Sequence, residues 1–366
     1  MLPRFPRSLF FSAVLFGMSI GVLTGCELSS NLEEDNIVAG VDFAELFADV
    51  TPAEMNAVKI DWASREYPAE DVVVVLQQAI TVGNTPGTIR VVSHTVGGIK
   101  HFGAIISADG LDAGSAPVLV YSHGGDSGIS VDQEVMLVLS FFTDIADQFV
   151  YVIPSFRDET ISFQNTTWKS DGPPSPWDRD VDDALSLINV ATELVPGADP
   201  NKVAVLGFSR GAGVGMLMDV RNEQVDAVLD FFGPTDFFGT FVQDVSREIL
   251  MGEPRSLPGL EFLSDELLLP YQAGEISLEE VRMAMVRRSP VLFVDRIDRL
   301  QIHHGTADMI VPVSQAESMT RAMLAAGKTA EQFQTYLYDG GDHNPLTLEG
   351  SLERAKDFLI ELKAAN

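Results

Sequence analysis

One tight turn constrains the fold of this chain more than any other stretch of its sequence. An apolar, valine-rich run ends in Gly207-Phe208-Ser209-Arg210-Gly211, and small residues in a helical pattern follow. This order predicts a strand, a sharp turn and a helix, because glycines two positions before and after the serine relieve crowding in such a turn. The pattern therefore predicts a serine hydroxyl exposed at the edge of a sheet, with the next backbone N–H able to bind a developing oxyanion.

Strand-like and helix-like segments alternate along most of the chain. Residues 71–108 predict an antiparallel start to a sheet, with glycine-containing turns between its strands. Further apolar runs that predict strands cover residues 117–122, 149–154, 203–206, 227–232, 299–303 and 332–338. These runs alternate with helical patterns, among them residues 132–148 and 180–194. The alternation predicts a mostly parallel central sheet with helices on both faces. Ligands of such sheets bind beyond the carboxyl ends of the strands.

Residues 237–288 interrupt this alternation directly after a predicted strand. This segment contains helix-like and loop-like stretches and no strand-like run. An insertion after a strand usually lies over the strand ends, so we predict a helical lid above the site. We assign residues 41–366 to a single domain that contains this lid, since a chain of 366 residues with 46% hydrophobic residues can bury a large core.

The first 25 residues have a different character. Arg4 and Arg7 precede an apolar, uncharged stretch over residues 9–23, which is typical of a secretory signal and short for a membrane-spanning helix. The next residues, Leu23-Thr24-Gly25-Cys26, resemble the bacterial lipobox, which is cleaved before a cysteine that carries lipid. An ordinary signal peptide with an unrelated cysteine nearby is the alternative.

The lipobox interpretation assigns residues 1–25 to a lipoprotein signal peptide and residues 26–40 to a flexible, acidic tether. It predicts palmitate-containing lipid on Cys26, which would hold the protein to a membrane of the bacterial cell envelope, with its domain periplasmic or extracellular. Cys26 is the only cysteine, so no intrachain disulfide can form. The net charge of −29 argues against nucleic acid as a partner, because binding it requires basic groups to neutralise phosphates.

Several polar residues directly follow predicted strands, and parallel strands would bring them to one edge of the sheet. They are His123, Ser209, Asp236, Asp308 and His343. A serine is a weak nucleophile until a base takes its proton, and the base needs a third group to orient it. These residue types at one edge therefore indicate nucleophilic catalysis.

The order of residues in the chain narrows the choice of base and acid. In proteins with a serine turn of this kind, the acid comes after the serine along the chain, and the histidine comes after the acid. Of the histidines after the serine, His303 and His304 lie within a strand end, whereas His343 lies in a glycine-rich loop after the last strand. His343 is therefore the predicted base. Asp308 is the predicted acid, and Asp236 is the alternative, otherwise a loop-capping or hinge residue.

An oxyanion formed at the serine needs two backbone donors. The N–H of Arg210 is the first predicted donor. The second is expected in the loop His123-Gly124-Gly125-Asp126, where the backbone N–H of Gly125 is our choice and that of Asp126 is the next. His123 is interpreted as a structural residue of this loop.

The combined motifs resemble the prolyl oligopeptidase-like and dienelactone hydrolase-like α/β-hydrolases over residues 115–360. The motifs are His123-Gly124-Gly125, Asp180-Val181-Asp182-Asp183-Ala184, Asp199-Pro200-Asn201-Lys202-Val203, residues 207–211, Gly233-Pro234-Thr235-Asp236, Ser289-Pro290, and His304-Gly305 through Asp308 to Val311-Pro312. The resemblance implies the α/β-hydrolase fold and a triad of Ser209, Asp308 and His343. It implies no metal or organic cofactor.

Two departures bear on the substrate. The peptidases that the chain resembles carry a large β-propeller, for which there is no room before residue 115. Arg210 also replaces the aromatic residue often found after the serine in those peptidases. Both departures favour a lipid-anchored carboxylic ester hydrolase over a peptidase acting on short peptides. A surface lipoprotein that only binds ligands is the third possibility.

Overall fold

A computed structural model describes residues 36–257 and 259–364. The predicted signal peptide, Cys26 and residues 26–35 of the predicted tether lie outside this range. None of the helices in the described part of the chain is both long enough and apolar enough to cross a membrane. Residues 36–40 differ from the predicted tether, because Ile37 and Val38 form strand β1 (Ile37–Val38), which pairs with β2 (Val41–Asp42).

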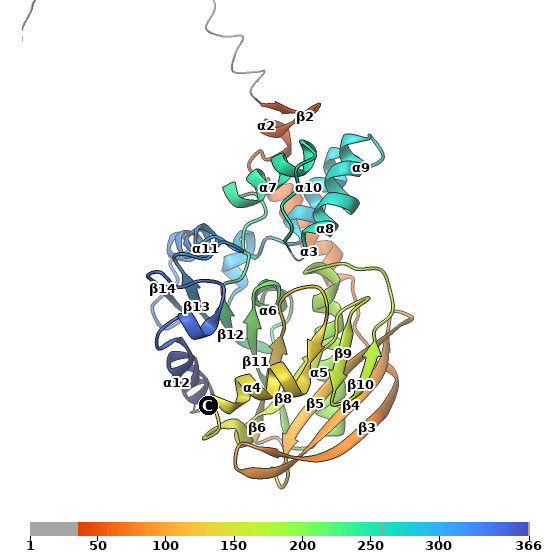
Figure 1. Ribbon diagram of the computed structural model, residues 1–366, viewed down its shortest axis with the longest axis vertical. Coiled ribbons are helices and arrows are strands. Elements are labelled where there is room, and N and C mark those ends of the chain that lie inside the picture. The colour runs from red at the N-terminus through yellow and green to blue at the C-terminus, as the bar shows by residue number, and fades with distance from the viewer. Residues whose placement is uncertain (1–35, 258, 365–366) are drawn as a thin grey trace, which may run out of the picture.

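A sheet of nine strands forms the centre of the described structure, in the order β14-β13-β12-β11-β6-β8-β5-β4-β3 (Figure 1). Its strands are β3 (Glu70–Val82), β4 (Thr85–Val96), β5 (Ile99–Ala108), β6 (Ala116–Ser122), β8 (Val150–Pro154), β11 (Ala198–Phe208), β12 (Val225–Phe231), β13 (Leu300–Gly305) and β14 (Phe333–Tyr338). The six strands from β14 to β8 are parallel, and β5, β4 and β3 continue the sheet antiparallel. The predicted antiparallel start and parallel centre are both confirmed.

Alternating side chains of the parallel strands pack into two separate apolar cores, one on each face of the sheet. In β11, Val203 and Val205 belong to one core, whereas Ala204 and Leu206 belong to the other. Strands buried on both faces need apolar residues at every position, which explains their continuous apolar runs. Helices α5 (Asp178–Leu194), α6 (Arg210–Arg221) and α11 (Ser314–Ala325) cover the first face, and α4 (Met136–Ser140) and α12 (Ser351–Ala364) cover the second.

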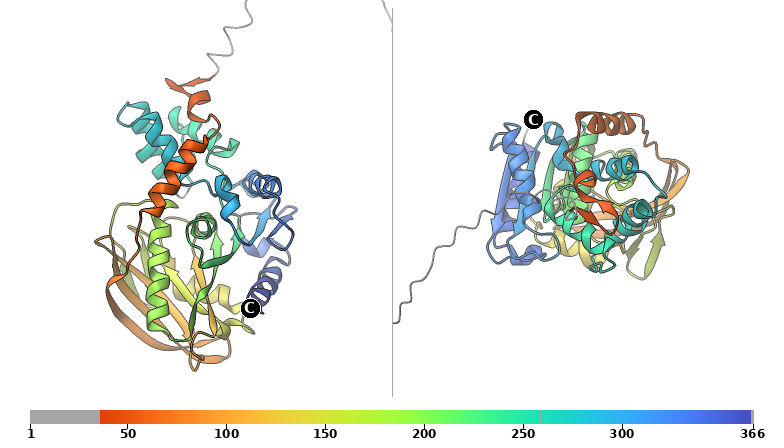
Figure 2. Two further views of the ribbon diagram at one scale, coloured as in Figure 1. Left: turned by 180° about the vertical axis from the view of Figure 1, so that it is seen from behind. Right: turned by 90° about the horizontal axis from the view of Figure 1, so that it is seen from above.

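The insertion after β12 and the amino-terminal segment lie together at one end of the molecule. Figure 1 and the left view of Figure 2 show this end at the top. The insertion contains α7 (Thr240–Leu250), α8 (Leu260–Phe262), η3 (Leu263–Leu268), α9 (Leu269–Gln272) and α10 (Leu278–Val286), and η4 (Pro290–Arg296) leads out of it. The amino-terminal segment contains α2 (Phe43–Leu46) and α3 (Pro52–Ala63).

Arg282 of α10 joins these two parts. Its guanidinium donates to the carbonyl oxygens of Leu46 and Ala48 at 2.8 and 2.9 Å, and its Nε donates to the carboxylate of Glu54 at 2.7 Å. The hydrogen bond from Arg282 lowers the pKa of Glu54 to about 2. The carbonyls at the end of α2 have no partner within that helix, so Arg282 satisfies groups that would otherwise need water.

Two regions differ from the predicted elements. The single helix expected over residues 132–148 is divided into η1 (Val131–Val135), α4 and η2 (Ala146–Gln148). A small sheet of β7 (Ile129–Ser130), β9 (Thr160–Phe163) and β10 (Thr166–Lys169), in which β9 is the central strand, was not predicted. These strands are four residues or shorter, which leaves too few positions for an alternating apolar pattern to show.

Candidate active site

Ser209 occupies the strained turn that its motif predicts. It joins β11 to α6 with φ 52° and ψ −124°, a conformation that non-glycine residues rarely adopt. A Cβ at Gly207 would lie 2.5 Å from the Cα of Ala212, and a Cβ at Gly211 would lie 2.0 Å from the carbonyl oxygen of Ser122. Both positions therefore require glycine, because any side chain would push the turn apart.

The carboxyl ends of five adjacent parallel strands bring the candidate residues together. Strands β14, β13, β12, β11 and β6 are neighbours in the sheet. His343 follows β14, Asp308 follows β13, Ser209 follows β11 and Gly125 follows β6. The sheet order thus explains how residues separated by up to 218 positions reach one edge.

His343 and Asp308 form a direct hydrogen bond. The Nδ1 of His343 lies 2.7 Å from Oδ2 of Asp308, while Oδ1 of Asp308 accepts the backbone N–H groups of Ile310 and Val311, both at 2.9 Å. Asp308 is buried, and the side chain of His343 is 20% exposed. Because a carboxylate accepts and does not donate, Nδ1 carries the proton and Nε2 is left as the acceptor.

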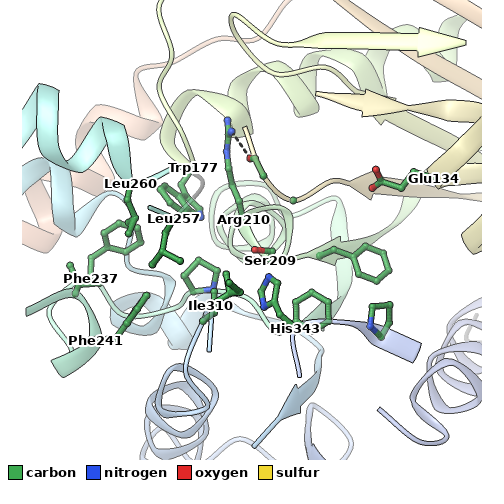
Figure 3. A pocket seen from close by; sticks show the side chains of 18 of the residues that line it. Glu134, Trp177, Ser209, Arg210, Phe237, Phe241, Leu257, Leu260, Ile310 and His343 are labelled. Atoms are coloured by element: carbon green, nitrogen blue, oxygen red, sulfur yellow. Dashed lines mark hydrogen bonds between the residues drawn. The ribbon is translucent and has the colours of Figure 1, made fainter. Parts of the chain in front are cut away.

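The imidazole of His343 lies beside Ser209 in one cavity of about 450 Å³ (Figure 3). The ring of Phe232, which follows β12, packs against it with the ring centres 4.3 Å apart. Gly124, Gly125 and Arg210 line the same cavity. The structure therefore gathers Ser209, His343 and both predicted oxyanion donors around one space, with Asp308 behind the imidazole.

The side chain of Arg210 connects the loop of residues 123–126, here called the glycine loop, to the turn at Ser209, here called the elbow. Its guanidinium donates to the carbonyl oxygen of Gly125 at 3.0 Å, to Oδ2 of Asp180 at 2.8 Å and to the carboxylate of Glu159. A Cβ at Gly124 would lie 2.9 Å from Cβ of Ser209, so the loop packs directly against the serine. The sequence pattern predicts a role only for the backbone N–H of Arg210, and nothing in it indicates this role of the side chain.

Two buried carboxyls share the Arg210 charge. Burial raises the pKa of Glu159 and that of Asp180, while Arg210 opposes the shift in both. His123 lies next to this group, with Nδ1 3.0 Å from the carbonyl oxygen of Gly124 and Nε2 3.5 Å from Glu159. Burial lowers the pKa of His123 to about 4, so the ring is neutral at pH 7. These contacts fit the structural interpretation of His123.

The alternative residues are engaged elsewhere. Asp236 accepts the hydroxyl of Ser318 at 2.6 Å and the backbone N–H of Phe238 at 3.0 Å, as a loop-capping residue does. His304 donates from Nε2 to the carbonyl oxygen of Val311 at 2.7 Å. His303 is stacked against the ring of Phe231, and burial lowers its pKa to about 3. None of these three residues is among those that line the cavity within the described ranges.

One part of the cavity wall comes from the insertion after β12, the segment that was expected to form a lid. The insertion contributes an apolar group, consisting of Phe237, Phe241, Val242, Leu257 and Leu260. Figure 3 shows labelled members of this group on one side of Ser209, together with Trp177, and Glu134 on the opposite side. Glu134 belongs to the segment that was predicted as part of an ordinary helix, where a single glutamate gives no functional signal.

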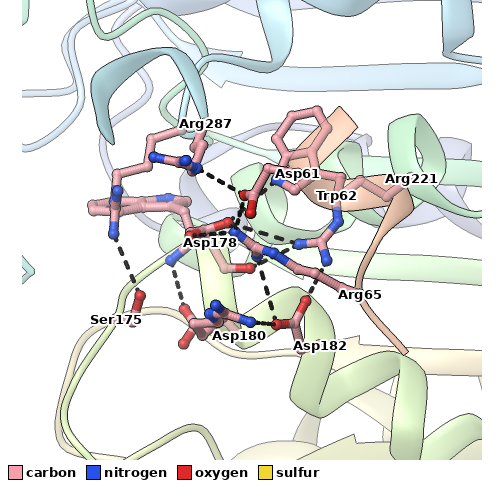
Figure 4. Close-up of polar contacts among 12 residues, drawn as sticks. Asp61, Trp62, Arg65, Ser175, Asp178, Asp180, Asp182, Arg221 and Arg287 are labelled. Carbon is pink, nitrogen blue, oxygen red and sulfur yellow. Dashed lines mark hydrogen bonds and ion pairs between the residues drawn. The ribbon is translucent and has the colours of Figure 1, made fainter. Parts of the chain in front are cut away.

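A charged network lies at the start of α5, whose first residue, Asp178, follows Trp177 (Figure 4). Asp178 accepts hydrogen bonds from Arg65 at 2.8 Å and from the indole N–H of Trp62 at 3.3 Å. Burial alone would raise the pKa of Asp178, but nearby arginines outweigh it and hold the pKa below its usual range. Arg287, just after α10, donates to Asp61 of α3 at 3.1 Å. The network thus joins the amino-terminal segment, the insertion and the start of α5.

Within residues 36–257 and 259–364, no group of three or more histidine, cysteine, aspartate or glutamate side chains is placed to hold a metal ion.

Comparison with known proteins identifies the fold. No protein-family model matches the chain. Over 97 residues it is 30% identical to a protein of Oryza sativa subsp. japonica described as a probable isoprenylcysteine alpha-carbonyl methylesterase. The matched segment spans 26% of this chain and only 22% of the length of the rice protein.

Solved structures match over most of the chain. Acetyl xylan esterase 1 from Thermoanaerobacterium sp. JW/SL YS485 superposes with a TM-score of 0.55 at 16% identity, over 85% of this chain and 92% of that one. An acetyl xylan esterase from Paenibacillus sp. R4 gives a TM-score of 0.57 at 15% identity, over 87% and 99%. A puromycin hydrolase gives 0.52 at 18% identity, over 82% of this chain and 40% of that one. Together with the sheet order, these similarities show that the chain has the α/β-hydrolase fold.

Proposed function

We propose that this protein is a serine hydrolase that cleaves carboxylic esters of small molecules. The observation that carries the proposal is the arrangement at the sheet edge. A serine held in a strained, glycine-flanked turn shares a cavity with a histidine whose Nδ1 is bonded to a buried aspartate. Such an arrangement supplies a nucleophile, a base and the group that orients the base.

Ser209 is the proposed nucleophile. Its Oγ attacks the ester carbonyl carbon while Nε2 of His343 takes the hydroxyl proton, and Asp308 stabilises the charged imidazole. The tetrahedral intermediate collapses when the C–O bond to the alcohol breaks, and His343 returns the proton to the departing alcohol. Water, deprotonated by His343, then attacks the acyl-enzyme, which releases the acid and restores Ser209. No metal or organic cofactor takes part in these steps.

The oxyanion of each tetrahedral intermediate is proposed to bind the backbone N–H groups of Arg210 and Gly125. Arg210 is the first residue of α6, so its N–H has no acceptor within the helix. Its guanidinium also holds the carbonyl of Gly125 at 3.0 Å, which fixes that loop relative to the elbow. Preorganised donors of this kind stabilise the developing charge without having to reorient during the reaction.

The structural similarity to two esterases extends over nearly their whole length, which supports an ester as the substrate. This chain covers 92% and 99% of the two acetyl xylan esterases, but only 40% of the puromycin hydrolase. The rice protein with a similar segment is also described as a methylesterase. Cleavage of short peptides by the same mechanism is the second candidate, since part of the puromycin hydrolase shares the fold.

An active-site probe tests the mechanism and a substrate panel tests the specificity. We expect a fluorophosphonate to label the wild-type protein at one site, with the adduct on the peptide that contains Ser209 in mass spectra. Short-chain p-nitrophenyl esters should be hydrolysed faster than aminoacyl or prolyl anilides. Labelling at another serine would reject the assignment of the nucleophile, and faster cleavage of anilides would favour the peptidase.

We also propose that lipid on Cys26 holds the protein in the bacterial cell envelope, with the hydrolase domain periplasmic or extracellular. The support is the Leu23-Thr24-Gly25-Cys26 motif after a basic and then apolar stretch. Inhibition of the lipoprotein signal peptidase in a bacterial host should cause the unprocessed precursor to accumulate. Unchanged processing would contradict the anchor without affecting the proposed hydrolase chemistry.

A further inference from the structure

Glu134 is a carboxyl group in the cavity for which the proposed reaction has no use. It lies in η1, which follows the glycine loop, and it lines the same cavity as Ser209 and His343. The hydroxyl of Tyr121 donates to its Oε1 at 3.0 Å. Within the described part of the chain, this hydroxyl is the only hydrogen-bond donor that contacts Glu134, so the carboxyl has further capacity to accept.

Most of the side chains that line the cavity together with Glu134 are apolar. The side chains around the cavity include those of Val138, Phe208, Phe232, Pro345 and the ring of Tyr121. Burial raises the pKa of Glu134, as expected for a carboxyl held against such side chains. A carboxylate in an apolar wall is unfavourable unless a ligand or a neighbour supplies donors or charge. Tyr121 supplies one donor and no charge, so the structure leaves the charge of Glu134 uncompensated.

Apart from the indole N–H of Trp177, which has no hydrogen-bond partner among the described residues, the other polar side chains of the cavity already have partners or a place in the reaction. Arg210 is bonded to Glu159, Asp180 and the glycine loop. Ser209 and His343 belong to the proposed reaction. Glu134 is thus the only acidic side chain among the residues that line this cavity in the described ranges.

We propose that Glu134 binds a protonated amine of the substrate, so that the preferred substrate is an ester with an ammonium group on one side of the scissile bond and an apolar group on the other. The inference rests on the proposed function. Figure 3 shows why the two sides differ, because Glu134 and the apolar insertion residues lie on opposite sides of Ser209. A substrate whose carbonyl reaches Ser209 would extend toward both.

Charge distinguishes an amine from a neutral donor such as a hydroxyl. An ammonium group supplies both a hydrogen bond and the positive charge that the half-buried carboxylate lacks, and charge-assisted hydrogen bonds are about twice as strong as neutral ones. The net charge of −29 would also raise the local concentration of cationic substrates.

Selectivity between matched esters tests the proposal. In one pair of esters the acyl chain ends in an ammonium group or in a methyl group, and in a second pair the alcohol carries the same difference. The readout is the ratio of kcat/KM for the amine to that for the methyl compound. Glu134→Gln should lower this ratio roughly 10- to 100-fold for the pair whose amine reaches Glu134, since hydrogen bonds to charged groups have about that effect.

Two further variants show whether Glu134 recognises the amine of the substrate or only supports the fold. Glu134→Leu should raise kcat/KM for the methyl ester while lowering it for the amine, which a residue that only supports the fold could not do. Asp132→Asn is the matched control, because Asp132 lies in the same short helix, is exposed and does not line the cavity. It removes one negative charge and should leave the ratio unchanged. A ratio that Glu134→Gln leaves unchanged in both pairs would overturn the proposal.

A binding measurement keeps the inference distinct from the hydrolase proposal. Titration calorimetry of the Ser209→Ala protein with an n-alkylammonium ion and with the alkanol of equal length requires no hydrolysis. The ammonium ion should bind at least 10-fold more tightly, and Glu134→Gln in the same background should abolish that preference. Equal binding of the two would reject the role of Glu134 even if hydrolysis is confirmed, whereas preferential binding without hydrolysis would reject only the proposed reaction.

Discussion

Replacing Ser209 by alanine is expected to lower kcat for a good ester substrate by about 10⁴- to 10⁶-fold, as loss of a serine nucleophile does in other hydrolases. Without Oγ no acyl-enzyme can form, and His343 and Asp308 have no proton to move. Residual hydrolysis should come only from binding and from the two backbone donors. The measurement is the steady-state rate of the purified variant, with its melting temperature as a check on folding.

Ser318→Ala is the matched control for this variant. Ser318 is a serine of α11 that donates to Asp236 at 2.6 Å and does not line the cavity within the described ranges. Its replacement should leave kcat within about threefold of the wild type, since this hydrogen bond lies outside the cavity and its loss should lower only the stability, by about 1 kcal/mol. A Ser209→Ala protein that kept a tenth or more of the activity would exclude Ser209 as the nucleophile.

Asp308→Asn should reduce kcat by about 10⁴-fold at neutral pH, because the substitution changes which nitrogen of His343 carries the proton. Oδ1 of Asp308 accepts two backbone N–H groups, from Ile310 and Val311. An asparagine must keep its carbonyl oxygen there, so its NH₂ group faces Nδ1 of His343. That nitrogen then has to accept, and Nε2 carries a proton toward Ser209 and can no longer act as the base.

The same substitution at Asp236 decides between the two acids. Asp236 bonds Ser318 and the N–H of Phe238, so Asp236→Asn should retain most of the activity. ¹⁵N chemical shifts of the His343 ring would show the tautomer directly, with Nδ1 protonated in the wild type and Nε2 protonated in Asp308→Asn. Loss of activity in Asp236→Asn together with an active Asp308→Asn would reverse the assignment of the acid.

Much of the sheet and the elbow could be predicted because their determinants are local. The glycines at 207 and 211 are required by contacts of 2.5 Å or less that any side chain would make, so the motif fixes the turn. The contact between His343 and Asp308 was also predictable, because each follows a parallel strand and the two strands are neighbours. The order of the strands in the sheet thus brings together residues that lie far apart in the sequence.

Other features of the site depend on contacts between distant segments and leave no pattern in the sequence. Arg210 reaches Gly125, 85 residues away, and Asp180, 30 residues away, yet its own neighbours in sequence give no indication of either. Glu134 is bonded by Tyr121 of β6 and shares its cavity with Phe208 of β11, and both of these residues come from other elements. The strand that begins at Ile37 was not predicted, for the same reason. Ile37 and Val38 pair with a strand that is only two residues long.

The attachment of the amino-terminal segment to the insertion has a geometric consequence for a protein tethered by lipid. Under the proposed anchor, nine residues lie between Cys26 and residue 36, and the ten Cα-to-Cα steps between them span at most about 35 Å. Residue 36 adjoins β1, at the same end of the molecule as α2 and the insertion (Figure 1). A short connection to the lipid at that end would turn the insertion toward the bilayer. The net charge of −29 would repel the domain from anionic headgroups. The protein would then lie apart from the lipid surface with its insertion facing the bilayer, an orientation set by the short connection and by the net charge.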